Sequence, residues 1–324
     1  MTNLLVGVVS ALVATNQPVA LTNLPPRLPT VALVAPDPND PVEKEYHKLM
    51  EDDDVAQAEV DKWIRDNQEF AAEDAGVSRE GLNRRILERF APVRQGYEIF
   101  LQQHTNHVRA RIAYASFLDD IHDEDASMTQ LERARELDPN EPSVWNNLAN
   151  HYGHNGLVTK AFDYYTQAIA LNPNEPVYYH NFGTTMFLFR KDAMEHYHLN
   201  EQQVFDKALA LYHAALKLAP DDFPLASDVA QTFYGIRPPR TDDALRAWTN
   251  AFNLARDDIE RQGVQTHFAR VKLHAARFDE ARLHLNIVTN EMYAELKRRL
   301  TRSLNAEETK TKGTNGPPTE AVKQ

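Results

Sequence analysis

One stretch near the middle of the chain repeats at a fixed spacing. Pro139-Asn140-Glu141-Pro142 returns 34 residues later as Pro173-Asn174-Glu175-Pro176. Three further pairs keep this spacing: Leu131 with Tyr165, Ala134 with Ala168, and Trp145 with Tyr179. Agreement at several positions is a much stronger signal than one recurring tetrapeptide. A period of this length indicates a stack of small supersecondary units, each too small to bury its apolar face alone.

The block 142–175 predicts two antiparallel helices that approach each other closely. Ala149 and Ala161 are small, so the two helix backbones can come near each other. Leu148, Tyr152 and Tyr165 fill the space between the helices at helical spacing. Pro173 ends the second helix, and Pro142 or Pro176 suits a first helical turn, where a missing N–H costs little.

This block resembles a tetratricopeptide repeat at nearly every position that defines that family. The matching residues are Trp145, Leu148, Ala149, Tyr152, Gly156, Ala161, Tyr165, Ala168 and Pro173. The same register extends to about five repeats, at 108–141, 142–175, 176–222, 223–258 and 262–295, of which the second is the most specific match. The resemblance implies an all-α fold, a right-handed solenoid of helix pairs with helical caps at its N- and C-terminal ends.

The segments outside the repeats are expected to be caps and a tail. Helical stripes of apolar residues over 43–107 predict an N-terminal helical cap or a divergent extra repeat. Residues 290–304 predict a C-terminal capping helix, and 305–324 predict a disordered tail because they show no periodicity. The four carboxylates of 51–54 are interpreted as the start of a helix over 55–70. Their negative charge would be stabilised by the positive N-terminal end of that helix.

The first twenty residues raise the question of export. Leu4 to Ala14 form an apolar run too short to span a bilayer, which suits the core of a secretory signal. Pro18-Val19-Ala20 offers a small-residue cleavage site, although Met1-Thr2-Asn3 lacks the usual basic residues. We therefore predict a signal peptide over 1–20, a mature N-terminus near Leu21, and a Pro-rich linker over 21–42. The predicted location is the periplasm of a bacterium, with the cytoplasm as the alternative.

Composition and missing motifs exclude several classes of function. The net charge of −12 over 324 residues argues against nucleic-acid binding, which needs a basic face. The absence of cysteine excludes disulfides, iron–sulfur clusters, thiolate zinc sites and cysteine nucleophiles. The sequence also lacks the dinucleotide-binding, P-loop, metalloprotease and serine-hydrolase motifs. We expect a protein that is not an enzyme, needs no cofactor, spans no membrane, and binds a protein or peptide whose identity the sequence leaves open.

The family resemblance implies a concave groove lined by the first helix of each repeat. By register, the candidate groove residues are Asn146, Asn150, His154, His180, Thr184, Phe187, Gln231 and Tyr234. Some family members grip a peptide carboxylate with Lys and Arg at such positions, but those residues are missing here. Asn and Tyr can instead hydrogen-bond a peptide backbone, and Phe187 and Tyr234 are the expected aromatic anchors. The alternative is a solvated groove with no specific ligand.

Two insertions form a second candidate surface. Residues 191–199 are predicted to be a loop inside the third repeat, followed by a helix cap at Asn200 with Gln203. Residues 235–240 enlarge the corresponding turn of the fourth repeat, with Thr241 as the next cap. Equivalent turns of neighbouring repeats share an edge, so we expect the insertions to be neighbours. The candidate edge residues are Glu195, His196, Tyr197, His198, Arg237 and Arg240. The alternative is that these insertions only pack on each other.

Two other functions remain as alternatives to a binding scaffold. A metal-dependent or enzymatic accessory factor would use the His-rich insertion, because histidines near carboxylates can bind metal ions. His151 and His154, three residues apart, are the other histidine pair of this kind. Solvated or groove-facing histidines are the more common situation, so no metal site is predicted. The third possibility is a structural array whose repeats mediate self-assembly.

Overall fold

The computed structural model describes residues 37, 39–71 and 77–314. The predicted signal peptide, most of the predicted linker and residues 315–324 lie outside this range. The described residues form α-helices and short 3₁₀ turns, with no strand among them, which confirms the all-α fold class. They divide into two compact units between Asn181 and Phe182, inside helix α7 (Pro176–Leu188), and each unit is described by itself below.

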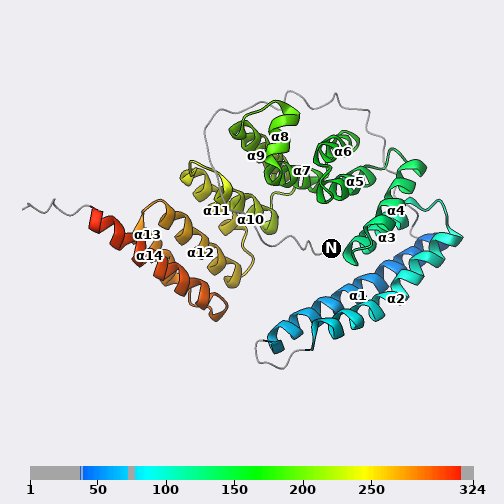
Figure 1. The fold of residues 1–324 in the computed structure, drawn as a ribbon, viewed down its shortest axis with the longest axis horizontal. Helices are drawn as coiled ribbons and strands as arrows, with labels where there is room; N and C mark the ends of the chain where they lie inside the picture. Colours follow the sequence, from blue (N-terminus) through cyan, green and yellow to red (C-terminus); the bar gives the residue numbers. More distant parts are fainter. Residues whose placement is uncertain (1–36, 38, 72–76, 315–324) are drawn as a thin grey trace, which may run out of the picture. The chain divides into compact units, whose positions relative to one another are not determined.

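The N-terminal unit opens with two long helices that lie side by side, α1 (Pro41–Ala71) and α2 (Arg79–Gln103) (Figure 1). They occupy the region predicted to be a helical cap. Their apolar seam includes Tyr46, Tyr97 and Phe100, which join one buried cluster with Phe117 and Leu118 of helix α3 (Val108–Asp120). The hairpin thereby covers the apolar surface of the helix pair that follows it, as the end of a repeat array requires.

The acidic run 51–54 lies in the middle of α1, so the prediction that it starts a helix is wrong. Asp53 is only 7% exposed, and the Tyr97 hydroxyl donates a 2.6 Å hydrogen bond to its Oδ2. The other three residues of the run are exposed. Four consecutive acidic residues therefore serve two purposes, because one faces a buried tyrosine while its neighbours face water.

Helix pairs follow at the predicted repeat positions of this unit. Helices α3 and α4 (Glu124–Leu137) form one pair, and α5 (Pro142–His154) and α6 (Val158–Leu171) form the next. Ala149 and Ala161 are fully buried, as expected for close helix packing. The turns inside the two pairs contain His122 at φ 62° and Gly156 at φ 78°. These positions lie 34 residues apart, so both repeats use a left-handed residue to reverse the chain.

The C-terminal unit contains the remaining helices and two 3₁₀ turns. In chain order these are α8 (Arg190–Tyr197), α9 (Glu201–Leu218), α10 (Phe223–Thr232), η1 (Phe233–Gly235), α11 (Thr241–Leu254), α12 (Asp258–His274), α13 (Phe278–Ile287), η2 (Glu291–Tyr293) and α14 (Ala294–Thr314). Helices α10 and α11 form one pair and α12 and α13 the next. Leu304 of α14 completes a buried cluster with Ala269, Leu273, Ala281 and Leu285, so α14 caps the last pair.

Three boundary predictions in this unit need correction. Residues 190–197 form helix α8, and not the loop predicted over 191–199. Thr241 is the first residue of α11 and not its cap, because Arg240 precedes the helix without a side-chain cap bond. The tail predicted to be disordered from 305 is helical as far as Thr314. The Asn200–Gln203 cap is confirmed as a reciprocal capping box at the start of α9.

None of the helices in the described part of the chain is both long and apolar enough to cross a membrane.

Candidate partner-binding surfaces

The candidate groove residues of the N-terminal unit are largely engaged in contacts between helices. Asn146 is 5% exposed, and its Oδ1 accepts a 3.1 Å hydrogen bond from Asn181 Nδ2 of α7. Asn150 Oδ1 accepts a 2.7 Å bond from the Tyr165 hydroxyl of α6. His180 is half-buried, whereas His154, the last residue of α5, is exposed. The asparagines therefore link neighbouring helices, and His154 is the most accessible member of this set.

The candidate groove residues of the C-terminal unit also differ in how far their side chains are exposed. Thr184 bonds the Tyr212 hydroxyl at 3.0 Å. Phe187 is 5% exposed and packs on Phe205 of α9, with 5.6 Å between ring centroids, so it belongs to the core and the expectation of a surface anchor is corrected. Tyr234 is half-buried, and Gln231 is exposed. Gln231 is therefore the most accessible member of this subset.

The two insertions both contact the first turns of α9. Arg190 at the start of α8 pairs with Glu201 at 2.9 Å, and Gln202 Nε2 donates to the Arg237 carbonyl at 3.3 Å. These contacts agree with the expectation that the two insertions are neighbours. Glu195 and His198 are exposed, and His196 and Tyr197 are half-buried. The exposed side chains of this segment, Lys191, Asp192, Glu195 and His198, therefore provide a polar surface.

Arg240 differs from the other candidate edge residues because it is a buried structural residue. Its Nη1 lies 2.6 Å from Asp206 Oδ1, and the two side chains are 9% and 15% exposed. Its Nη2 also lies 3.5 Å from Gln202 Oε1. This ion pair fixes the segment before α11 on α9, so the expectation that Arg240 is available to a partner is corrected.

The structure brings together an aromatic and basic cluster that the sequence did not indicate as a unit. Tyr234 Oη lies 2.9 Å from His267 Nδ1 of α12, and the His267 ring stacks on Trp248 of α11 at 3.9 Å between centroids. The Arg270 guanidinium lies 4.2 Å from the centre of the Tyr234 ring. Burial, with a contribution from Arg270, lowers the pKa of His267 to about 4, so this imidazole is neutral at pH 7.

The histidine pairs show no metal-binding geometry. Within the described ranges, no group of three or more His, Cys, Asp or Glu residues converges to hold a metal ion. His151 is 7% exposed, with Nδ1 3.7 Å from Asp119 and Nε2 2.9 Å from Asn155. His151 therefore links the end of α5 to the preceding repeat.

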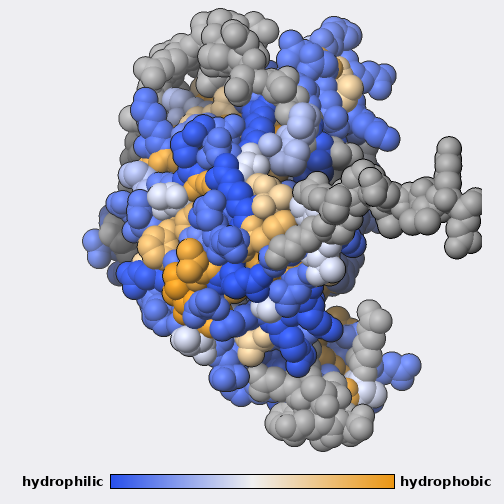
Figure 2. All heavy atoms as spheres, turned by 90° about the vertical axis from the view of Figure 1, so that its left-hand side faces the viewer, coloured by the Kyte–Doolittle hydropathy of each residue, from blue (hydrophilic) through white to orange (hydrophobic). Residues whose placement is uncertain are grey.

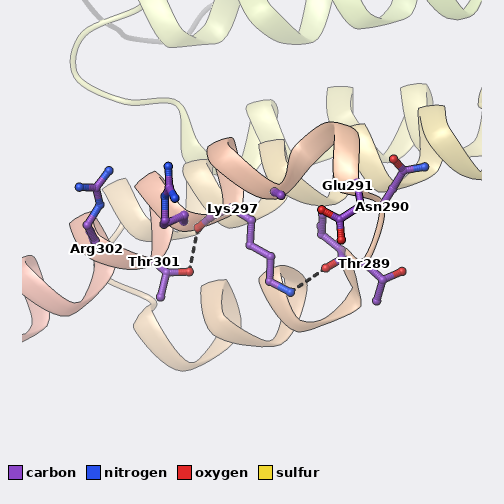
Figure 3. A pocket seen from close by; sticks show the side chains of 9 residues that line it. Thr289, Asn290, Glu291, Lys297, Thr301 and Arg302 are labelled. Atoms are coloured by element: carbon purple, nitrogen blue, oxygen red, sulfur yellow. Dashed lines mark hydrogen bonds between the residues drawn. The ribbon is translucent and has the colours of Figure 1, made fainter. Parts of the chain in front are cut away.

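A shallow hollow lies at the C-terminal cap (Figure 3). It encloses about 390 Å³ between the loop 288–291 and the first turns of α14. Lys297 closes one wall by donating a 2.7 Å hydrogen bond to the Val288 carbonyl at the end of α13. Two exposed apolar residues, Leu283 and Ile287, lie in the second half of α13, just before this loop in the sequence. Figure 2, drawn from the side on which Figure 1 shows α13 and α14, shows hydrophobic residues scattered among hydrophilic ones.

Comparisons with known proteins found relatives that are similar to part of this chain. No family model matches the chain. The photosystem I assembly protein Ycf3 of Acaryochloris marina is 34% identical over 92 residues, which are 28% of this chain and 55% of that protein. Ycf3 of Cyanophora paradoxa is 32% identical over 99 residues, 30% of this chain and 57% of that protein. The chain thus spans about half the length of these curated relatives.

Among solved structures, YrrB, a TPR protein with an unusual peptide-binding site, covers 65% of this chain and 97% of its own, with 13% identity and a TM-score of 0.46. The evidence for repeated helix pairs comes from the residues of this chain. The signature positions of 142–175, the helix pairs at the predicted boundaries and the equivalent turns at His122 and Gly156 agree with one another. The chain therefore has the architecture of helix pairs that its resemblance to tetratricopeptide repeats implies.

Proposed function

We propose that this chain is a non-catalytic scaffold that binds another protein. The observation that carries the proposal is the repeated helix pair, because such a unit presents side chains from successive first helices along a continuous surface. An extended surface of this kind suits a polypeptide partner better than a small molecule, which needs a concave pocket that buries most of it. The match to assembly proteins among the curated relatives supports a role in assembling a complex.

The accessible candidate residues favour the C-terminal unit as the place of binding. Three of the four exposed candidates, Gln231, Glu195 and His198, lie in this unit, and the fourth, His154, lies in the N-terminal unit. By contrast, the asparagines of the N-terminal unit already bond to neighbouring helices. We also propose that the protein is exported, because the apolar run Leu4–Ala14 suits a secretory signal.

Affinity capture followed by cross-linking mass spectrometry tests this function. The whole chain is immobilised, exposed to native extract, and treated with an amine-reactive cross-linker. We expect a partner in stoichiometric amount whose cross-links fall on Lys191, Lys207 or Lys272 of the C-terminal unit. Lys44, Lys48 and Lys62 of α1 serve as the internal control, because they are exposed and lie outside the repeats. Cross-links confined to α1, or no partner above the level of a heat-unfolded control, would contradict the proposal.

A further inference from the structure

Helix α3 begins after an unusual capping residue. His107 precedes its first turn, and the Nδ1 atom of this histidine accepts a 3.0 Å hydrogen bond from the backbone N–H of Ala110. In the described part of the chain, the other α-helices with a capping side-chain bond use serine, asparagine or an acidic residue; these caps are Ser78, Glu141, Asn200, Asp222 and Asp257. Side chains of those types do not ordinarily change charge between pH 5 and 8, whereas imidazole does.

The contacts of this imidazole determine which ring nitrogen carries the hydrogen. A nitrogen that accepts a bond from an N–H group cannot carry a hydrogen in the same direction, so Nδ1 of His107 is unprotonated. The hydrogen of the neutral ring therefore lies on Nε2, which is 3.3 Å from Glu43 Oε1 of α1. Only 12% of the His107 side chain and 13% of the Glu43 side chain are exposed. His107 thus connects the first turn of α3 with the first turn of α1 through one tautomer.

The His107 ring is also packed against both helices of the N-terminal hairpin. Its centroid lies 4.8 Å from that of the Tyr46 ring of α1 and 5.1 Å from that of the Phe100 ring of α2. The backbone N–H of His107 donates a 3.0 Å hydrogen bond to the carbonyl of His104, which directly follows α2. A change in the charge of this ring therefore acts where the hairpin meets the first repeat pair.

The charged groups around the ring act on its protonation in opposite directions. Burial lowers the pKa of His107, and the positive charges of Arg109 and protonated His104 act in the same direction, whereas Glu43 raises this pKa. The Glu43 carboxylate is shared, because its Oε2 accepts a 2.8 Å hydrogen bond from Arg109 Nη1. His104 has its own carboxylate, with Nε2 3.4 Å from Glu45 Oε2. The positive N-terminal end of α3 also disfavours a cation at its cap, so the folded protein favours the neutral ring.

We propose that His107 is an acid-sensitive cap that releases the first turn of α3 when its Nδ1 atom is protonated. The added hydrogen occupies the lone pair that accepts the Ala110 N–H, so two donors face each other and the cap bond is lost. Nε2 keeps its hydrogen, and its contact with Glu43 becomes a charge-assisted one. Protonation therefore exchanges a bond within α3 for a stronger bond to α1, and the ring stays on the hairpin while the first turn of α3 loosens.

The direction of the pH dependence follows from the lowered pKa of His107. The stability that the neutral cap contributes is complete above the unfolded pKa of about 6.5. It is lost as the pH falls below that value and through the folded pKa. Release of the first turn of α3 is therefore expected on acidification and not at alkaline pH.

NMR spectroscopy of the isotope-labelled whole chain tests this cap. Long-range proton–nitrogen spectra at pH 7.5 should place the hydrogen of the His107 ring on Nε2 and leave Nδ1 bare. On acidification to pH 5, the Ala110 amide resonance should shift with the same midpoint as the His107 ring. Hydrogen exchange of that amide, corrected for its intrinsic pH dependence, should become about fivefold faster, which is the effect of losing a typical N-cap bond.

Two variants separate the cap from the other titrating groups nearby. His107→Asn should abolish the acid response of the Ala110 amide, because asparagine keeps an oxygen that can accept the cap bond but does not titrate. His104→Asn is the matched control and should leave the response unchanged, because that imidazole faces Glu45.

Several results would overturn the inference. A hydrogen on Nδ1 of His107 at pH 7.5 would refute the cap, as would an Ala110 amide that does not respond while the His107 ring titrates. These two measurements need only the wild-type chain, so they decide the question even where a variant fails to fold. An acid response that persists in His107→Asn, or that disappears in His104→Asn, would place the acid-sensitive group elsewhere. No partner takes part in these measurements, so their outcome is independent of the proposed scaffold function.

Discussion

Single polar side chains connect neighbouring segments of this protein through buried or nearly buried contacts. Asp53 accepts the Tyr97 hydroxyl within the N-terminal hairpin, and Asp206 pairs with Arg240 within the C-terminal unit. Buried polar groups of this kind are costly when one partner is lost, because the other remains desolvated. Their contribution to stability is therefore measured best by removing one partner at a time and then both.

The Arg240–Asp206 ion pair gives a direct test at this scale. Arg240→Met is expected to lower the free energy of unfolding by about 3 kcal/mol, because it leaves a nearly buried carboxylate without its partner. The Arg240→Met, Asp206→Leu double variant should recover most of that loss, since neither charge remains. Urea unfolding followed by circular dichroism measures both changes. An unchanged unfolding midpoint in the single variant would show that the pair contributes nothing.

His267 predicts how stability depends on pH. Its folded pKa of about 4 lies below the value of about 6.5 in an unfolded chain, so the folded state disfavours the protonated form. This contribution to the free energy of unfolding is fully present above pH 6.5 and is lost as the pH falls towards 4. At pH 5 the loss relative to neutral pH is on the order of 2 kcal/mol. Thermal unfolding of wild type and His267→Asn at pH 7.5 and pH 5 should show a smaller acid loss in the variant. Parallel pH profiles would contradict this assignment.

At the scale of the helix pair, much of the fold could be predicted because it follows from periodic spacing. The boundaries of α5 and α6 follow from Pro142, Pro173 and the 34-residue repeat. Helix α8 was missed because Arg190–Tyr197 has only one fully buried residue, Ala193, and so carries no apolar stripe. Phe187 was misplaced because a register position does not reveal that Phe205 of α9 covers it.

The aromatic and basic cluster of the last repeats could not be predicted for a different reason. Tyr234 and His267 are 33 residues apart, and they belong to two different repeats, the fourth and the fifth. The spacing of His267, Arg270 and His274 along one face of α12 was a usable signal, but only once η1 is known to lie against that face. Contacts between side chains of neighbouring repeats depend on rotamers and helix offsets, which no periodic pattern encodes.

The contact between α5 and α6 predicts the effect of added volume. Ala161 is fully buried, so Ala161→Leu should cost about 1–3 kcal/mol of stability by overpacking the helix pair. Ala170→Leu on the same helix is the control, because that residue is only half-buried and should cost less. Thermal unfolding of the two variants side by side checks the difference. Equal stability would show that the proposed register of the second repeat is wrong.

The turn between the same helices predicts a purely backbone effect. Gly156 has φ 78°, and a Cβ atom added there would meet nothing within 4 Å. Gly156→Ala should therefore cost about 1–2 kcal/mol through the left-handed conformation alone, with no steric clash. Gly156→Asn should cost less, because asparagine tolerates this conformation better. Chemical denaturation of both variants is the measurement, and a larger loss for Asn than for Ala would contradict the backbone explanation.

At the scale of the whole molecule, the repeated helix pairs form the framework, and the segments that depart from the repeat distinguish this chain from a regular array. Helix α8, the segment 235–240 and the aromatic and basic cluster around Tyr234 and His267 all lie in the C-terminal unit. The N-terminal unit begins with a long hairpin whose apolar seam completes the first repeat. This division suggests that the C-terminal unit recognises the partner and that the N-terminal hairpin stabilises the array.

Hydrogen–deuterium exchange of the whole chain, alone and with its captured partner, tests this division most directly. We predict that the partner slows exchange in 223–240 and 258–274, the segments that carry Gln231 and the aromatic and basic cluster around Tyr234 and His267. Exchange in 41–103 should be the same with and without the partner, because the hairpin is assigned a structural role. Slower exchange confined to 41–103, with no change in the two C-terminal segments, would contradict the central claim that the repeats are the binding surface.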